Sequence, residues 1–73
     1  MHNLAEGFDS GSNPEFVRFL KIARRSASEV QSQLYLALDL NYIAPEDLER
    51  GYELATETKK LINGMMAYLH QQN

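Results

Sequence analysis

Cysteine and tryptophan are absent from this chain of 73 residues, and only two histidines occur in it. The lack of cysteine excludes a disulfide framework and is typical of proteins in a reducing cytoplasm. A zinc site is not supported either, because His2 and His70 stand at opposite ends of the sequence with no thiolate to join them. A single core stabilises so short a chain only weakly. We therefore expect self-association to supply the missing stability.

The sequence also lacks a secretory signal and a membrane span. Met1-His2-Asn3 has neither a basic nor an apolar leader region, and no apolar run approaches the roughly 18 residues that cross a bilayer. The net charge of −3 argues against tight nonspecific binding to nucleic acid. We expect a soluble cytoplasmic protein that makes no membrane contact.

No pattern predicts catalysis, a metal or a cofactor. Neither histidine lies near a serine in the sequence, and no glycine-rich phosphate loop follows a strand pattern. Five carboxylates gather in the second half of the chain: Glu46, Asp47, Glu49, Glu53 and Glu57. They lack the alternating ligands of a calcium loop and the Glu-x-x-His pairs of di-metal bundles. We interpret them as the solvated start of a helix and expect no enzyme activity and no cofactor.

What is present is a strong helical pattern that begins at Asn13. Asparagine is a good N-cap, Pro14 suits the first helical position, and Glu15 places negative charge at the positive end of the helix. Apolar residues then recur at alternating spacings of four and three: Phe16, Leu20, Ala23, Ala27, Val30, Leu34 and Ala37. Others lie partly off this stripe: Phe19, Ile22, Tyr35, Leu36, Leu38 and Leu40. One antiparallel neighbour cannot cover both sets.

A second long helix is predicted from Pro45, after a turn at residues 42–44, because a residue before proline disfavours helix. Its apolar residues also form two stripes. One contains Leu48, Tyr52, Ala55, Ile62, Met66 and Leu69, with Lys59 in a gap, and the other contains Leu54, Leu61, Met65 and Tyr68. The chain should form one all-α domain, with an N-terminal stub and connector over 1–12 and long helices over 13–42 and 45–71.

The predicted fold is therefore a long antiparallel helical hairpin that completes a helical bundle by oligomerisation. The positions assigned to the core or the oligomer contact are Phe16, Phe19, Leu20, Val30, Leu34, Leu38, Leu54, Leu61, Ile62, Met65 and Leu69. Gly64 costs about 1 kcal/mol relative to alanine inside a helix. Its presence indicates either that another helix approaches closely at this position or that the helix tolerates this loss of stability.

One basic set is a candidate for nucleic-acid binding. Its members are Arg18, Lys21, Arg24 and Arg25. Arg18, Lys21 and Arg25 are separated by three and four positions, so they share one helical face, and Arg24 lies close by. Such a face can hold phosphates in an oligomer. The alternative is a solvated face with local ion pairs, formed by Glu15 with Arg18 and by Glu29 with Arg25.

Several stretches carry a resemblance to a known family. They are Asn3-Leu-Ala-Glu-Gly-Phe8, Asn13-Pro-Glu-Phe-Val-Arg-Phe-Leu-Lys-Ile-Ala-Arg24, Glu29 with Gln33-Leu-Tyr-Leu-Ala-Leu38, and Asn63-Gly64. They resemble the four helix bundle protein family, which includes proteins encoded within intervening sequences of bacterial 23S ribosomal RNA and the accessory variability proteins of diversity-generating retroelements. The resemblance implies a bundle protomer in a ring-like homopentamer, with a role near RNA or a reverse transcriptase and no catalytic residues.

Members of that family carry further helices before the segment that matches Ala5 to Phe8, so the resemblance implies the back half of the fold, as a natural truncation or a fragment. A dimer of hairpins is then an alternative to the pentamer. We expect a noncatalytic oligomeric scaffold, associated with RNA or an RNA-handling partner through the basic set. The alternative is a protein-interaction module that binds no nucleic acid.

Overall fold

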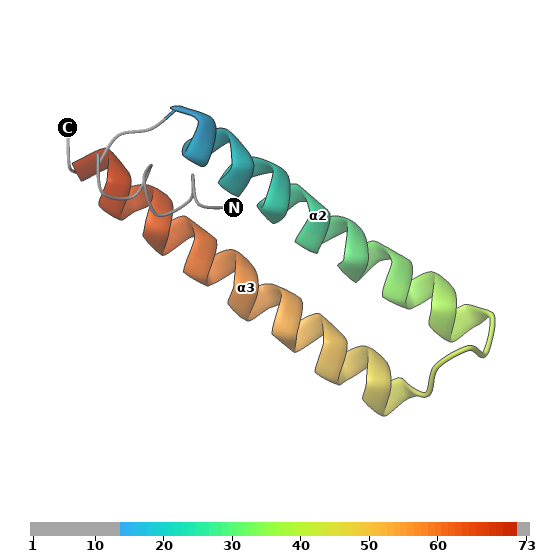
Figure 1. The fold of residues 1–73 in the computed structure, drawn as a ribbon. Helices are drawn as coiled ribbons and strands as arrows, with labels where there is room; N and C mark the ends of the chain where they lie inside the picture. Colours follow the sequence, from blue (N-terminus) through green and yellow to red (C-terminus); the bar gives the residue numbers. More distant parts are fainter. Residues whose placement is uncertain (1–13, 72–73) are drawn as a thin grey trace.

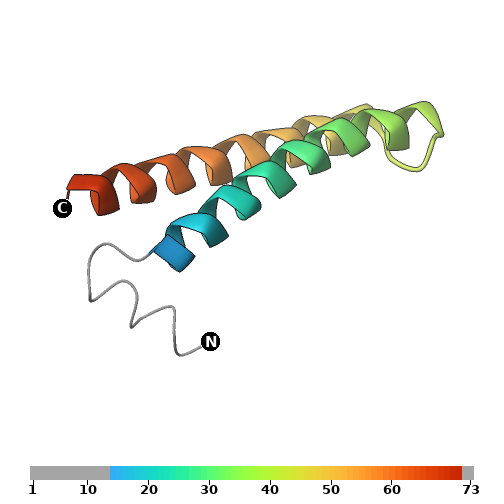
Figure 2. The same cartoon turned by 90° about the horizontal axis from the view of Figure 1, so that it is seen from above.

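The structure, a computed structural model, describes residues 14–71. They form two α-helices, α2 (Pro14–Asp39) and α3 (Pro45–Gln71), which run antiparallel side by side (Figure 1). The view from above shows the same two helices as a single layer (Figure 2), and the molecule measures 46 × 20 × 15 Å. The predicted all-α hairpin is confirmed. The predicted N-terminal stub and the predicted N-cap Asn13 lie outside the described residues.

The first helix ends at Asp39 rather than at residue 42 as predicted. Its end is closed by Asn41, whose φ of 64° is left-handed. The N–H of Tyr42 donates to the carbonyl of Ala37 at 2.9 Å, and the N–H of Asn41 donates to that of Leu38 at 3.0 Å. This pair of hydrogen bonds is the Schellman closure, which satisfies carbonyls at a helix end. The prediction extended the helix too far because it relied on Pro45 as the stop signal.

The second helix begins with an N-cap that has no side-chain acceptor of its own. Ala44 occupies that position, and its N–H donates to Oδ2 of Asp47 at 3.0 Å. The backbone N–H of Asp47 donates in turn to the carbonyl of Ala44 at 2.9 Å. Asp47 also lies 3.6 Å from Arg50. A carboxylate at the third helical position therefore stabilises this start, as in a capping box.

The core between the helices is small. Its buried apolar residues are Phe16, Leu20, Ala55, Ile62 and Leu69. Four of them cluster toward the open end of the hairpin, where Met65 and Met66 pack against them. Toward the turn, a Cβ at Gly51 would lie 3.1 Å from Cδ1 of Leu34. The close helix approach therefore occurs at Gly51. A Cβ at Gly64 would meet no atom of the hairpin within 4 Å.

Neither described helix combines the length and the apolar character that a membrane crossing requires.

Candidate functional site

A buried amide lies at the centre of the contact between the helices. Gln31 is only 6% exposed. Its Nε2 donates to the hydroxyl of Thr56 at 2.8 Å and to the carbonyl of Tyr52 at 3.1 Å. Its Oε1 accepts from the ammonium of Lys59 at 2.7 Å. Every polar atom of this side chain is therefore paired, as burial in a small core demands.

Further polar contacts join the helices along one edge. The ammonium of Lys59 also donates to the hydroxyl of Ser28 at 3.1 Å, and the guanidinium of Arg24 donates to the amide oxygen of Asn63. Toward the turn, the rings of Tyr35 and Tyr52 meet edge to face, with centroids 5.8 Å apart. We call this edge the polar flank. It contains Arg24, Ser28 and Tyr35 of α2, and Tyr52, Lys59 and Asn63 of α3.

The opposite edge of the hairpin is apolar. Residues two positions apart in a helix point about 200° away from each other. In α2, Ile22 precedes Arg24 by two positions and Val30 follows Ser28 by two. The same offset places Leu54 and Leu61 of α3 opposite Tyr52 and Asn63. Both helices therefore present apolar side chains to the same edge.

We call this edge the apolar flank. It contains Phe19, Ile22, Val30 and Leu40 of α2, and Leu54, Leu61, Met65 and Tyr68 of α3. Most of these side chains are strongly exposed, with Leu54 at 61% and Leu61 at 66%. Leu54, Leu61 and Tyr68 recur every seven residues, which is the spacing of a seam that packs against another helix. Ser26 and Gln33 interrupt the α2 side of the seam.

The structure divides the basic set. Arg18, Lys21 and Arg25 are exposed on the outer face of α2, whereas Arg24 is half-buried and bonded to Asn63. Among residues 14–71, the ion pair within 4.0 Å is that of Asp47 with Arg50. The local pairs of the alternative interpretation, Glu15 with Arg18 and Glu29 with Arg25, are not within that distance. The three exposed cations therefore share the outer face with no described carboxylate within 4.0 Å.

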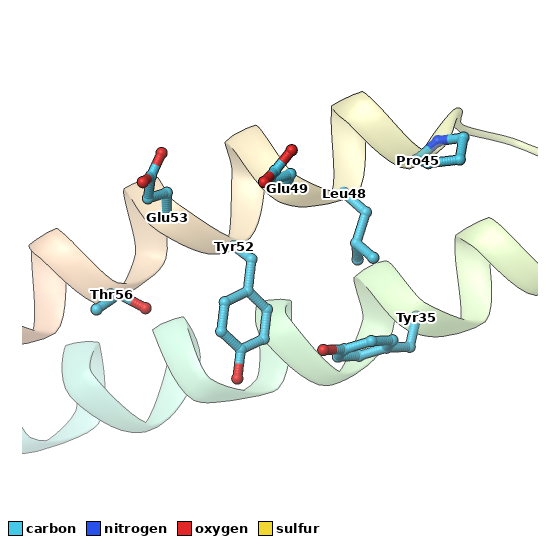
Figure 3. Close-up of a pocket in the computed structure, with 7 residues that line it drawn as sticks. All are labelled: Tyr35, Pro45, Leu48, Glu49, Tyr52, Glu53 and Thr56. Carbon is cyan, nitrogen blue, oxygen red and sulfur yellow. The ribbon is translucent and has the colours of Figure 1, made fainter.

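A hollow of about 460 Å³ opens on the polar flank near the turn. Its lining residues are Tyr35, Pro45, Leu48, Glu49, Tyr52, Glu53 and Thr56 (Figure 3). Tyr52 projects from α3 toward α2, and the ring of Tyr35 lies below Leu48, while Glu49 and Glu53 project from the outer side of α3. The rings form an inner wall of the hollow, and the carboxylates form its outer rim.

The positions assigned from the sequence to the core or the oligomer contact fall into three groups. Phe16, Leu20, Ile62 and Leu69 are buried; Leu34, Leu38 and Met65 are half-buried; Phe19, Val30, Leu54 and Leu61 are exposed. Sequence reasoning missed Gln31. Its spacing of four from Ala27 and three from Leu34 places it on the inward stripe, but the polar side chain of glutamine by itself predicts an exposed position. In the described part of the chain, no group of three or more carboxylates and histidines is arranged to hold a metal ion.

The family model described as 23S rRNA-intervening sequence protein matches residues 1–64, which confirms the resemblance carried by the sequence motifs. Comparisons with curated proteins and with solved structures found no match.

Proposed function

This chain belongs to the 23S rRNA-intervening sequence protein family, and from that premise we propose that it is a noncatalytic scaffold whose apolar flank binds a second copy of the chain. The observation that carries the proposal is the placement of the exposed apolar side chains. Of the eleven large apolar side chains that are exposed among the described residues, seven lie on the apolar flank, at positions contributed by both helices. Contiguous apolar surface of this kind is typical of protein interfaces rather than of monomer surfaces.

The size of the flank suits such an interface. The hairpin is 46 Å long and 20 Å wide, so the side that carries the flank has room for the roughly 800 Å² that each partner buries in a standard interface. An apolar hollow of about 370 Å³ is lined by residues of α3, among them Leu61, Met65 and Tyr68. It has room for an apolar side chain of the second copy. Two hairpins joined through these flanks form an intermolecular four-helix bundle, in which both small cores are enlarged.

The proposal is tested by replacing Leu54 and Leu61 with glutamine. Glutamine retains helix propensity, so the hairpin keeps its local preference while the seam loses two of its apolar contacts. We expect the mass in solution to fall to that of the 8.3 kDa chain. The control is Tyr42→Gln, which changes an exposed ring in the turn, 78% exposed and outside the flank. An unchanged mass in the double variant would contradict the proposal, and a ring-like pentamer would appear as a fivefold mass in the unaltered chain.

RNA binding is a second candidate function, supported by the exposed basic face. Arg18, Lys21 and Arg25 share that face at helical spacing, with no described carboxylate within 4.0 Å. The family is described by reference to 23S rRNA, which makes a structured ribosomal RNA fragment the first probe. Self-association would bring several copies of the face together and strengthen a weak contact.

The RNA candidate is tested by a binding series over salt concentration. Replacing all three exposed cations with glutamine should reduce the slope of log K against log salt by about 2 to 3, because each phosphate contact contributes roughly one unit. The control replaces Arg50 and Lys60, two exposed cations on α3. Binding of the unaltered chain that does not exceed background at low salt would exclude this role and leave the protein-interaction module.

A further inference from the structure

We propose that the hollow beside Tyr35 and Tyr52 binds the guanidinium group of an arginine side chain in a partner protein. The hollow lies on the polar flank, opposite the apolar flank, so it stays open when a second copy covers the apolar edge. The proposal therefore adds a second binding surface to the scaffold. It does not depend on the self-association proposed above.

The aromatic wall supplies the first recognition element. The two tyrosine rings meet at an interplanar angle of 73°, so their faces do not cover each other. Tyr35 is 53% exposed and Tyr52 is 39% exposed. An open aromatic face attracts a cation, and arginine is the cation that proteins place there most often. The planar guanidinium also stacks on such a ring, which a lysine ammonium cannot do.

The carboxylate rim supplies the second element. Glu49 and Glu53 are one helical turn apart, exposed, and without a lysine or arginine nitrogen within 4.0 Å among the described residues. Their charge favours a cationic guest and disfavours the phosphates of RNA. The positive end of α3 opposes this field, but Glu46 and Asp47 in its first turn offset it.

The remaining lining fits the stem of the guest. Pro45 and Leu48 are apolar neighbours of the rings, and an arginine side chain buries its methylene groups along apolar surface while its head stays polar. A volume of about 460 Å³ exceeds one side chain, so adjacent residues of an extended peptide also find room. The nearby cations of this chain are already engaged, Lys59 with Gln31 and Arg50 with Asp47. The hollow is therefore not filled by a cation of its own hairpin, and we assign the guest to a partner protein.

The test is a titration of the isotope-labelled full chain with a short blocked peptide that contains one arginine, followed by NMR. A single exposed contact of this type binds more weakly than millimolar, so the peptide is titrated to about 100 mM. We expect the signals of Tyr35, Tyr52 and Glu53 to shift with the arginine peptide. The matching citrulline peptide, which has the same shape without the charge, should shift them at least about threefold less at equal concentration.

Matched charge variants separate the rim from the general acidity of α3. Glu49→Gln with Glu53→Gln should weaken binding at least about threefold. Glu46→Gln with Glu57→Gln removes the same charge from the same helix but from residues that do not line the hollow, and should weaken it clearly less. Tyr35→Leu should also reduce binding, with the circular dichroism of the hairpin unchanged. Equal effects of the two glutamate pairs, equal binding of citrulline, or shifts of these residues by a short oligouridylate instead would overturn the proposal.

Discussion

The side-chain amide of Gln31 donates a hydrogen bond of 2.8 Å to the hydroxyl of Thr56, across the contact between α2 and α3. The same amide nitrogen also donates to the carbonyl of Tyr52, and the amide oxygen accepts from Lys59. Both polar atoms of the Gln31 side chain are therefore hydrogen-bonded. Such a contact can form in only one register of the two helices, whereas apolar contacts tolerate sliding. The hairpin therefore combines a small apolar core with the hydrogen bonds of Gln31, which set the alignment of α2 against α3.

Replacing Gln31 tests this alignment. Gln31→Ala should lower the free energy of unfolding by about 1–3 kcal/mol, because it leaves a cavity and removes an acceptor from the Lys59 ammonium. Gln31→Leu should cost less, since it refills the space with apolar volume, but should broaden the NMR signals of the helix contact. The exposed Ser32→Ala, next to Gln31 but outside both flanks, is the control and should change stability by no more than about 0.5 kcal/mol. Equal losses at Gln31 and Ser32 would show that the buried amide has no special role.

The turn offers a second test at Asn41. Its φ of 64° is costly for most side chains. Asn41→Ala should therefore destabilise the hairpin by about 1 kcal/mol, whereas Asn41→Gly should retain nearly all of the stability because glycine adopts this conformation freely. Chemical denaturation of the two variants at equal protein concentration measures the difference. A greater loss with glycine than with alanine would contradict the assignment of the turn.

The two helical glycines should respond differently to alanine. Gly64→Ala places its Cβ in open space and should raise the free energy of unfolding by up to about 1 kcal/mol through helix propensity. Gly51→Ala should gain less or lose stability, because its Cβ would lie 3.1 Å from Leu34. Thermal unfolding at matched concentration compares them. Gly64 lines the apolar hollow assigned above to a second copy, so the gain is expected in samples dilute enough to be monomeric. A loss of stability in Gly64→Ala under those conditions would contradict the expectation.

The sequence predicted the hairpin because its start signals are local. Pro14 and Pro45 stand at the first positions of the two helices, and the apolar spacings in between are strongly helical. The end of α2 was harder to place. A left-handed asparagine closes that helix, but asparagine is also common at N-caps and in turns, so Asn41 alone does not identify the last turn.

The surfaces were less predictable because they depend on contacts between distant residues. Spacing placed Arg18 and Arg24 in one basic set, yet Asn63, 39 positions from Arg24 in the chain, draws only Arg24 to the polar flank. Gln31 is stable inside the core only because its partners on α3 stand opposite. The sequence showed an excess of apolar surface, but its placement on one edge required the rotation of each helix within the hairpin.

We propose that the hairpin associates with a second copy through the apolar flank. Sedimentation equilibrium over about a hundredfold range of concentration, with thermal unfolding followed on the same samples, tests it most directly. We predict a mass of two or more chains of 8.3 kDa each and an unfolding midpoint that rises with protein concentration. A mass of one chain throughout, with a cooperative midpoint independent of concentration, would contradict the claim.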